Sequence, residues 1–170
     1  MLSKSPFITV TFLALSLTAC QDYQFSVNEK ELYRPPAAIT ELEATDTALM
    51  ACLDQHIKDA NITDSKALKR LNCSSAGITD VNGLNQFLEL TQINLADNQL
   101  SQLEGLLGMT QLKDLDLSNN RVADIQPLFS MNRLRWVDLQ GNEAVACADI
   151  KQLERVTGAQ VISPNHCLAK

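Results

Sequence analysis

The amino-acid sequence predicts an α/β solenoid, a fold in which successive coils of the chain each add one short strand to a parallel sheet. Two observations lead to this prediction. Apolar residues recur with a period of 22 residues from position 68 to position 155. Within each period, apolar and polar residues alternate as they do along a half-buried strand. The chain of 170 residues is long enough for one domain with a substantial core.

Residues 1–19 have the layout of an export signal. Lys4 gives a positive start, and the apolar run at 7–17 (FITVTFLALSL) is too short to span a bilayer but has the length of a signal core. The stretch that follows, Leu17-Thr18-Ala19-Cys20, resembles the lipobox of bacterial lipoproteins, in which a signal peptidase cuts before the cysteine. The alternative is an ordinary cleaved signal with a cysteine there by chance.

The resemblance implies that Cys20 carries a diacylglycerol and a further acyl chain, and two chains suffice for stable attachment to a membrane. In enterobacteria an aspartate directly after the lipidated cysteine tends to retain a lipoprotein in the inner membrane. Gln21 stands there, so we expect a lipid-anchored protein of the bacterial cell envelope, in the outer membrane. Residues 20–45 then form the lipidated cysteine and a tether, since they contain Pro35-Pro36 and no sustained apolar period.

Residues 46–67 are predicted to form an amino-terminal helical cap. Apolar residues recur there at steps of three and four, which places them on one face of a helix. Asp46 or Thr47 is placed to cap that helix. The apolar positions are Leu49, Cys52, Leu53, Ile57 and Ala60.

Four copies of the 22-residue pattern follow, beginning at Leu68, Leu90, Leu112 and Leu134. Positions 1, 4 and 6 of each copy are apolar and should point inward, and apolar residues at positions 14, 17 and 20 should return the chain to the core on the other side. Position 9 is asparagine in three copies, where its amide can bond to buried turn backbone. Those residues are Asn98, Asn120 and Asn142, and Ala76 replaces them in the first copy.

This pattern resembles the leucine-rich repeats of bacterial internalins. The resemblance implies a short stack of four repeats over residues 68–155, with a parallel sheet on the concave side and irregular or 3-10 turns on the convex side. Residues 156–170 should form a carboxyl-terminal cap with a degenerate fifth strand. In that strand Val156, Ala159 and Val161 match positions 1, 4 and 6.

Four cysteines fall within the caps and repeats, and we expect two disulfides. Cys147 and Cys167 lie 20 residues apart, close to one period, so they should occupy similar places on neighbouring coils. Cys52 and Cys73 lie 21 residues apart and would join the cap helix to the first strand. An exported protein permits both bridges. Buried free thiols remain the alternative, and so does a zinc site on Cys147, His166 and Cys167, although tetrahedral zinc takes four ligands.

Composition and motifs argue against catalysis and against nucleic acid. A chain with a formal net charge of −6 gains little from counterion release on a nucleic acid. The two histidines, His56 and His166, are not near a nucleophile in a recognisable arrangement, and no phosphate loop or calcium loop is present. We therefore expect no enzyme, no cofactor and no resident metal.

The outward positions of the predicted strands provide the candidate binding surface, a polar sheet that becomes acidic toward its carboxyl-terminal half. A tryptophan on such a face often anchors a partner. The predicted partner-binding residues are Arg70, Gln92, Asn94, Asp114, Asp116, Trp136, Asp138 and Gln140. We expect recognition of a protein partner, with a basic surface as the complement. Two alternatives would leave no binding site. In one, Trp136 packs flat on Arg135 or Gln140, and in the other the aspartates only keep the face solvated. The alternative functions are a scaffold for an envelope complex and, more remotely, an enzyme acting on the cell wall.

Overall fold

The computed structural model describes residues 25–27, 30–33 and 43–168. The predicted export signal, the lipidation site Cys20 and the Pro35-Pro36 pair lie outside these residues. The chain divides into two compact units, Met1–Pro35 and Pro36–Lys170. In the described part of the chain, no helix is both long enough and apolar enough to cross a bilayer.

The first unit contains a two-stranded antiparallel sheet. Strand β1 (Phe25–Val27) pairs with β2 (Lys30–Tyr33), and the register shifts between Phe25 and Ser26. The sequence predicts a tether throughout this region. The hairpin leaves no signal in the sequence because three- and four-residue strands are too short to produce a measurable apolar alternation.

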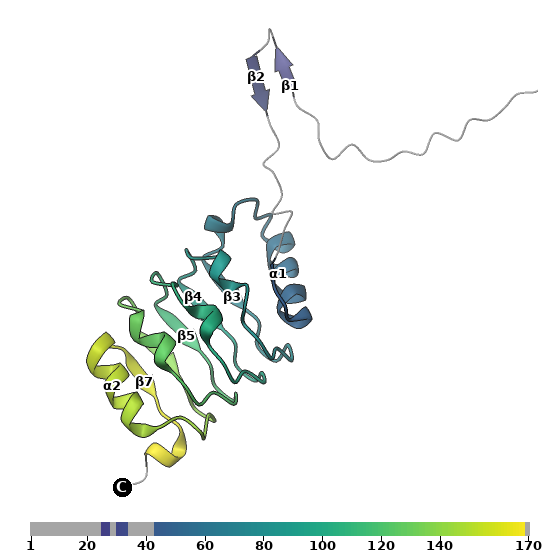
Figure 1. The fold of residues 1–170 in the computed structure, drawn as a ribbon. Coiled ribbons are helices and arrows are strands. Elements are labelled where there is room, and N and C mark those ends of the chain that lie inside the picture. Colours follow the sequence, from purple (N-terminus) through teal and green to yellow (C-terminus); the bar gives the residue numbers. More distant parts are fainter. Residues whose placement is uncertain (1–24, 28–29, 34–42, 169–170) are drawn as a thin grey trace, which may run out of the picture. The chain divides into compact units, whose positions relative to one another are not determined.

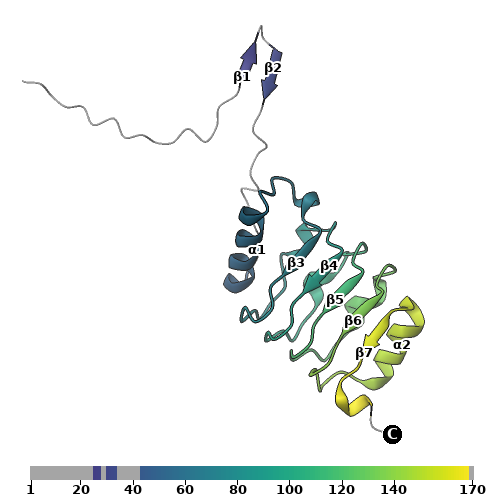
Figure 2. The ribbon, with the colours of Figure 1, turned by 180° about the vertical axis from the view of Figure 1, so that it is seen from behind.

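The second unit is a solenoid with a five-stranded parallel sheet in the order β3-β4-β5-β6-β7 (Figures 1 and 2). From β3 to β6, each strand residue pairs with the residue 22 positions further along the chain, for example Arg70 with Gln92. The predicted solenoid with one parallel sheet is confirmed. The strands are β3 (Arg70–Asn72), β4 (Gln92–Asn94), β5 (Asp114–Asp116), β6 (Trp136–Asp138) and β7 (Gln160–Ile162).

One apolar core runs along the whole solenoid between the sheet and the opposite, convex side. The residues at positions 1, 4 and 6 of the four copies are at most 3 % exposed. On the convex side the first three coils return through single 3-10 turns, as predicted. These turns are η2 (Leu84–Gln86), η3 (Glu104–Leu106) and η4 (Gln126–Ser130). Two further 3-10 turns lie near the ends of the domain, η1 (Ser65–Ala67) and η5 (Asn165–Cys167).

The amino-terminal cap is helix α1 (Thr47–Asp59), which buries Leu49, Leu53 and Ile57 against the first coil. Asp46 is its N-cap: Oδ1 accepts hydrogen bonds from the N–H groups of Ala48 and Leu49, at 2.8 and 2.9 Å.

The other carboxylate oxygen of Asp46 connects the cap to the first coil. It accepts bonds from the N–H and hydroxyl of Thr79, at 2.8 and 2.7 Å. Burial of this carboxyl raises its pKa, but the hydrogen bonds from Leu49, Thr79 and Ala48 outweigh burial and hold the pKa at about 2. The carboxylate is therefore ionised at neutral pH, and one side chain both caps α1 and attaches it to the solenoid.

The carboxyl-terminal end departs from the predicted pattern. The fourth coil returns through helix α2 (Cys147–Thr157), not through a 3-10 turn, and this helix crosses the predicted boundary at residue 156. Val161 pairs with Val137, so the fifth strand is displaced by two residues from the predicted register. Val156, expected inward at position 1, is 55 % exposed on α2. An α-helix has a different rise per residue from a 3-10 turn, so the last coil needs 24 residues to reach the next strand.

The position-9 asparagines form a buried column along the edge where the chain leaves the sheet. Asn98, Asn120 and Asn142 are 7 %, 7 % and 0 % exposed. Each Oδ1 accepts a bond from a backbone N–H of the preceding coil, and each Nδ2 donates to backbone carbonyls of its own coil and of the preceding one. In the first coil, which has Ala76 at this position, the Ala76 N–H donates a bond of 3.2 Å to Asn98 Oδ1.

Both predicted disulfides are present. Cys52 of α1 is bonded to Cys73 of the first coil, with a Cα–Cα distance of 5.8 Å. Cys147, the first residue of α2, is bonded to Cys167 of η5, with a Cα–Cα distance of 5.4 Å. One bridge thus joins each cap to the end of the stack.

Candidate functional site: the concave face

Two columns of side chains project from the concave face of the sheet. The strand register stacks Arg70, Gln92, Asp114, Trp136 and Gln160 in one column, and Asn72, Asn94, Asp116, Asp138 and Ile162 in the other. Neighbouring residues of a column are about 4.8 Å apart because that is the strand spacing. Alternation along each strand therefore brings residues from distant parts of the sequence onto one surface.

A hollow of about 330 Å³ lies on this face, between α1 and β6. Its polar lining comes from Arg70, Gln92, Asn94 and Asp116, and its aromatic wall is Trp136. His56 of α1 completes the rim, and its Nε2 accepts a hydrogen bond of 3.1 Å from the N–H of Asn72. Trp136 is half-buried. The hollow combines an apolar surface with groups that can bond to a ligand.

The polar groups of the face are partly fixed by bonds within the protein. Gln92 Nε2 donates to Asp114 Oδ2 at 2.7 Å, which joins two neighbouring residues of one column across β4 and β5. Asp116 Oδ1 accepts bonds from the N–H and hydroxyl of Ser118, and Asp138 Oδ1 accepts one from the N–H of Gln140. In each of these two aspartates, Oδ1 accepts a hydrogen bond from the residue two places further along the chain. This bond holds the carboxylate in a defined direction on the face.

Asp116 and Asp138 are neighbours in the same column, so two carboxylates face the same space. Burial raises the pKa of the Asp138 carboxyl; the hydrogen bond from the Gln140 N–H opposes that shift, and the Asp116 carboxylate adds to it. A positive charge placed between the two carboxylates would relieve this repulsion. The carboxyl-terminal half of the face is therefore suited to a cation.

The structure gathers some of the predicted residues into the hollow and leaves others beside it. Arg70, Gln92, Asn94, Asp116 and Trp136 line it. Asp114 in β5, Asp138 in β6 and Gln140 just after β6 lie on the same face but do not line the hollow.

Three residues of the concave face and its rim were not predicted from the sequence. His56 reaches the rim from the cap helix, and no local pattern indicates this. Gln160 and Ile162 extend the two columns on β7, and our register for that strand placed them two positions off. A shift of two residues keeps each side chain on the same face of a strand, so alternation alone would have identified Gln160 as outward.

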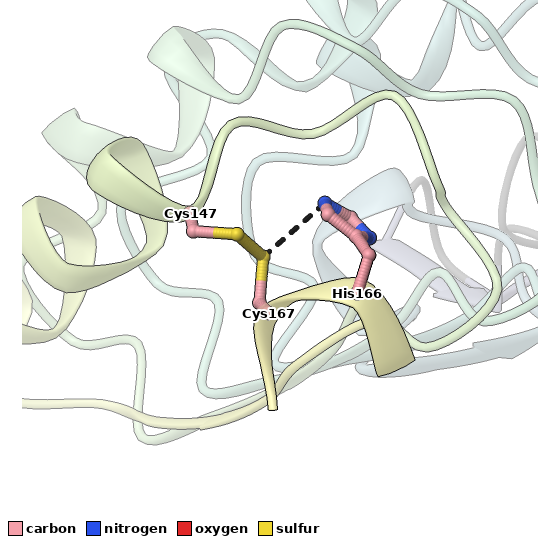
Figure 3. Close-up of side chains that lie close together, drawn as sticks. All are labelled: Cys147, His166 and Cys167. Carbon is pink, nitrogen blue, oxygen red and sulfur yellow. Dashed lines mark hydrogen bonds between the residues drawn. A yellow bond between two sulfur atoms is a disulfide. The ribbon is translucent and has the colours of Figure 1, made fainter. Parts of the chain in front are cut away.

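The only cluster of three potential metal ligands among the described residues is Cys147, His166 and Cys167 (Figure 3). The two sulfur atoms are bonded to each other, so neither is a thiolate that could bind zinc. Both ring nitrogens of His166 lie 2.9 Å from an oxygen atom, one from the Glu143 carboxylate and one from the Val145 carbonyl. With its cysteines bridged, this cluster is a structural clamp on the carboxyl-terminal cap.

The parallel concave sheet, the asparagine column and the convex 3-10 turns define a leucine-rich repeat solenoid of the internalin type. Two solved structures with this fold are similar to the chain. Internalin C2 of Listeria monocytogenes matches with a TM-score of 0.60 and 23 % identity, over 68 % of this chain and 53 % of that one. Internalin InlF of the same species matches with a TM-score of 0.55 and 22 % identity, over 63 % of this chain and 33 % of that one.

This chain therefore spans about half or less of the length of these two internalins, and at such identity the likeness concerns the fold alone. No protein-family sequence pattern and no curated protein sequence matches the chain.

Proposed function

We propose that this chain is a non-catalytic recognition protein that binds a protein partner on the concave face of its leucine-rich repeat domain. The observation that carries the proposal is the hollow in which Trp136 stands beside Asp116 and opposite Arg70. A half-buried tryptophan with hydrogen-bonding groups around it has the composition of a binding hot spot. The stacked coils hold these groups on a rigid sheet, which limits the ordering cost of binding.

The charges on the face favour a partner that presents a basic side chain. Asp114, Asp116 and Asp138 lie on β5 and β6 around Trp136. An arginine of the partner could stack on the indole ring while its guanidinium bonds to a carboxylate. Arg70 at the β3 end would instead favour an acidic or neutral group there. The partner surface should therefore be basic opposite β5 and β6 only.

The position of the protein in the cell follows from the segment before the domain. Leu17-Thr18-Ala19-Cys20, placed after an apolar run of signal length, supports lipidation at Cys20 and anchoring in the bacterial cell envelope, in the outer membrane. The anchor would hold the concave face near its partners at a membrane surface, and attachment to a surface raises the effective concentration of a binding pair.

Trp136→Ala is expected to weaken binding by about 2 kcal/mol or more, because an anchoring aromatic side chain contributes much of the energy of an interface. The free energy of unfolding should change little, since the side chain projects away from the core. A photo-crosslinking residue at Gln92 would first capture the partner, and the purified partner would then be titrated against each variant. Leu107→Ala on the convex side, where the side chain is 50 % exposed, is the matched control.

Charge reversal tests the acidic half of the same face. Replacing Asp116 and Asp138 by lysine should slow association and reduce its dependence on salt, because opposite charges steer the encounter. The control replaces Glu104 and Glu154 by lysine. Glu104 lies on the convex side and Glu154 on α2, so the net charge changes by the same amount away from the concave face. The concave-face proposal fails if the partner binds the Trp136, Asp116 and Asp138 triple variant as tightly as the parent.

Cys20→Ser should move the protein from the membrane fraction to the soluble fraction and abolish incorporation of labelled fatty acid. The reason is that the cysteine sulfur carries the lipid, and without acyl chains little apolar surface holds the protein on a bilayer. Fractionation and metabolic labelling of cells that express parent and variant give the measurement. Unchanged membrane association of the serine variant would contradict lipid anchoring without affecting the proposal for the concave face.

A further inference from the structure

A basic surface lies along the edge where the sheet strands begin, apart from the concave face. The residue directly before each of β3 to β6 is Lys69, Thr91, Lys113 or Arg135, and the residue three places before is Ala67, Glu89, Gln111 or Arg133. These eight positions hold four basic side chains and one acidic one, in a chain whose formal net charge is −6. Positive charge is therefore concentrated at this edge.

Only part of this charge is neutralised within the protein. Lys69 Nζ lies 2.9 Å from Glu89 Oε2 and forms an ion pair. Arg133 Nη1 donates at 2.6 Å to the neutral Gln111 Oε1, which orients the guanidinium without compensating its charge. Among residues 43–168, no carboxylate lies within 4.0 Å of the charged nitrogens of Lys113, Arg133 or Arg135.

These three cationic residues line one hollow of about 430 Å³, together with Asn132 and the end of α2 at Thr157 and Gly158. Lys113 and Arg135 occupy equivalent places on adjacent coils, and the Arg135 N–H donates to the Lys113 carbonyl at 2.8 Å. Their backbones are thus held side by side, with Arg133 two residues away on the same coil. The cationic side chains start from fixed positions around the same space.

The carboxyl-terminal end of α2 does not cancel these charges. A helix end carries about half a negative charge, which is small beside three full positive ones. Two carbonyls near this end also have hydrogen-bond partners, since the Leu153 carbonyl accepts a bond of 2.8 Å from Thr157 Oγ1 and the Glu154 carbonyl one of 2.9 Å from the Gly158 N–H. The hollow therefore presents N–H donors and positive charge.

We propose that this hollow binds a phosphate group. Two arginines and a lysine match it, because the planar guanidinium donates two parallel N–H bonds to phosphate oxygens and the ammonium adds a compact charge. Three cationic side chains also balance the roughly two negative charges of a phosphate monoester at neutral pH. The same chemistry would be supplied by a soluble phosphate ester or by the headgroup of an anionic phospholipid. The site is independent of the concave face.

Titration of the full-length chain with inorganic phosphate at low ionic strength tests the proposal. In the test variant, Lys113, Arg133 and Arg135 are all replaced by glutamine, and we expect the affinity for phosphate to fall tenfold or more. The matched control replaces Lys58, Arg121 and Lys151 by glutamine, which removes the same charge from other surfaces and should change the affinity less than twofold. Thermal unfolding of both variants verifies that the fold is intact.

Vesicles distinguish the two sources of phosphate. Co-sedimentation of the full-length chain with phosphatidylcholine vesicles is compared with and without added phosphatidylglycerol. The variants share the amino-terminal segment, so any difference between them reports on the hollow. A gain in binding from phosphatidylglycerol that the test variant lacks identifies a lipid headgroup as the ligand, whereas phosphate binding without such a gain identifies a soluble ester. Equal phosphate affinity of parent and test variant, or an equal loss in the control, would overturn the proposal.

Discussion

Replacing Asn120 by alanine is expected to lower the free energy of unfolding by about 3 to 5 kcal/mol, because the amide makes four hydrogen bonds to the backbone, three of them buried. Nδ2 donates to the carbonyls of Leu95, Leu117 and Ser118 at 2.9, 3.0 and 3.2 Å, and Oδ1 accepts from the Leu100 N–H at 3.0 Å.

The carbonyls of Leu95 and Leu117 are shared with the neighbouring asparagines, Asn98 and Asn142. Each carbonyl would keep one partner in the alanine variant, but the Leu100 N–H would lose its bond. A buried backbone N–H without a partner is rare in folded proteins and costs its full desolvation penalty, which is why we expect a large effect.

Chemical denaturation of the parent, the alanine variant and Asn120→Asp gives the measurement. The aspartate has the same shape, but its ionised carboxylate cannot donate to the three carbonyls. Burial and these carbonyls should raise its pKa in the folded state above that in the unfolded state, so its stability should fall as pH rises through that interval and recover toward acid pH. Asn132→Ala, at an exposed position, is the control and should change stability by about 0.5 kcal/mol or less. An alanine variant as stable as the parent would show that the column is dispensable.

Cys147→Ser is expected to lower the free energy of unfolding by about 2 to 4 kcal/mol, because the bridge to Cys167 closes a loop of some 20 residues and so restricts the unfolded chain. The bridge also fixes the start of α2 to η5, at the carboxyl-terminal end of the described coils. Without it, α2 and β7 should open before the central coils do, since terminal elements have the fewest neighbours. Denaturation monitored together with hydrogen exchange of α2 gives the measurement.

A double-mutant cycle separates the bridge from the individual side chains. Cys167→Ser in the Cys147→Ser background should cost little more, because the interaction is already lost. The second bridge provides an internal comparison: loss of Cys52–Cys73, with a loop of similar length, should destabilise α1 and leave exchange in α2 unchanged. Additive losses from the two serine substitutions, or free thiols at both positions in protein isolated from cells, would contradict the predicted role of the bridge.

Much of the repeat domain could be predicted because its interactions are local and repeated. Leu115 and Leu117 alternate with Asp114 and Asp116, so one strand fixes which side chains face the core. The 22-residue period then transfers that assignment to the neighbouring coils. The pair Cys147–Cys167 followed from the same periodicity, since residues about one period apart lie on adjacent coils. The pair Cys52–Cys73 followed from the position of the cap helix beside the first strand.

The prediction failed where the period changes. Val156 was placed in the core because it lies 22 residues after Leu134, but α2 occupies that part of the chain and exposes the side chain. In the fourth coil Ala144 stands where the other copies have Ile78, Leu100 and Val122, and the next residue, Val145, is the buried one, at 1 % exposed. The first three coils return by 3-10 turns and the fourth by an α-helix, and the 22-residue period does not indicate this change.

The sequence by itself determined the solenoid, the four strands from β3 to β6, the inward and outward faces and the pairing of Cys147 with Cys167, because each follows from a period of 2 or 22 residues. Only the tertiary structure decided how β7 aligns, how His56 reaches the rim beside Arg70, and how α2 closes a hollow around Lys113, Arg133 and Arg135. These features depend on how the caps and the last strand are placed against the coils, which the 22-residue period does not fix. Their distances are set by the packing of helices against coils, and that packing depends on the shape of the whole core.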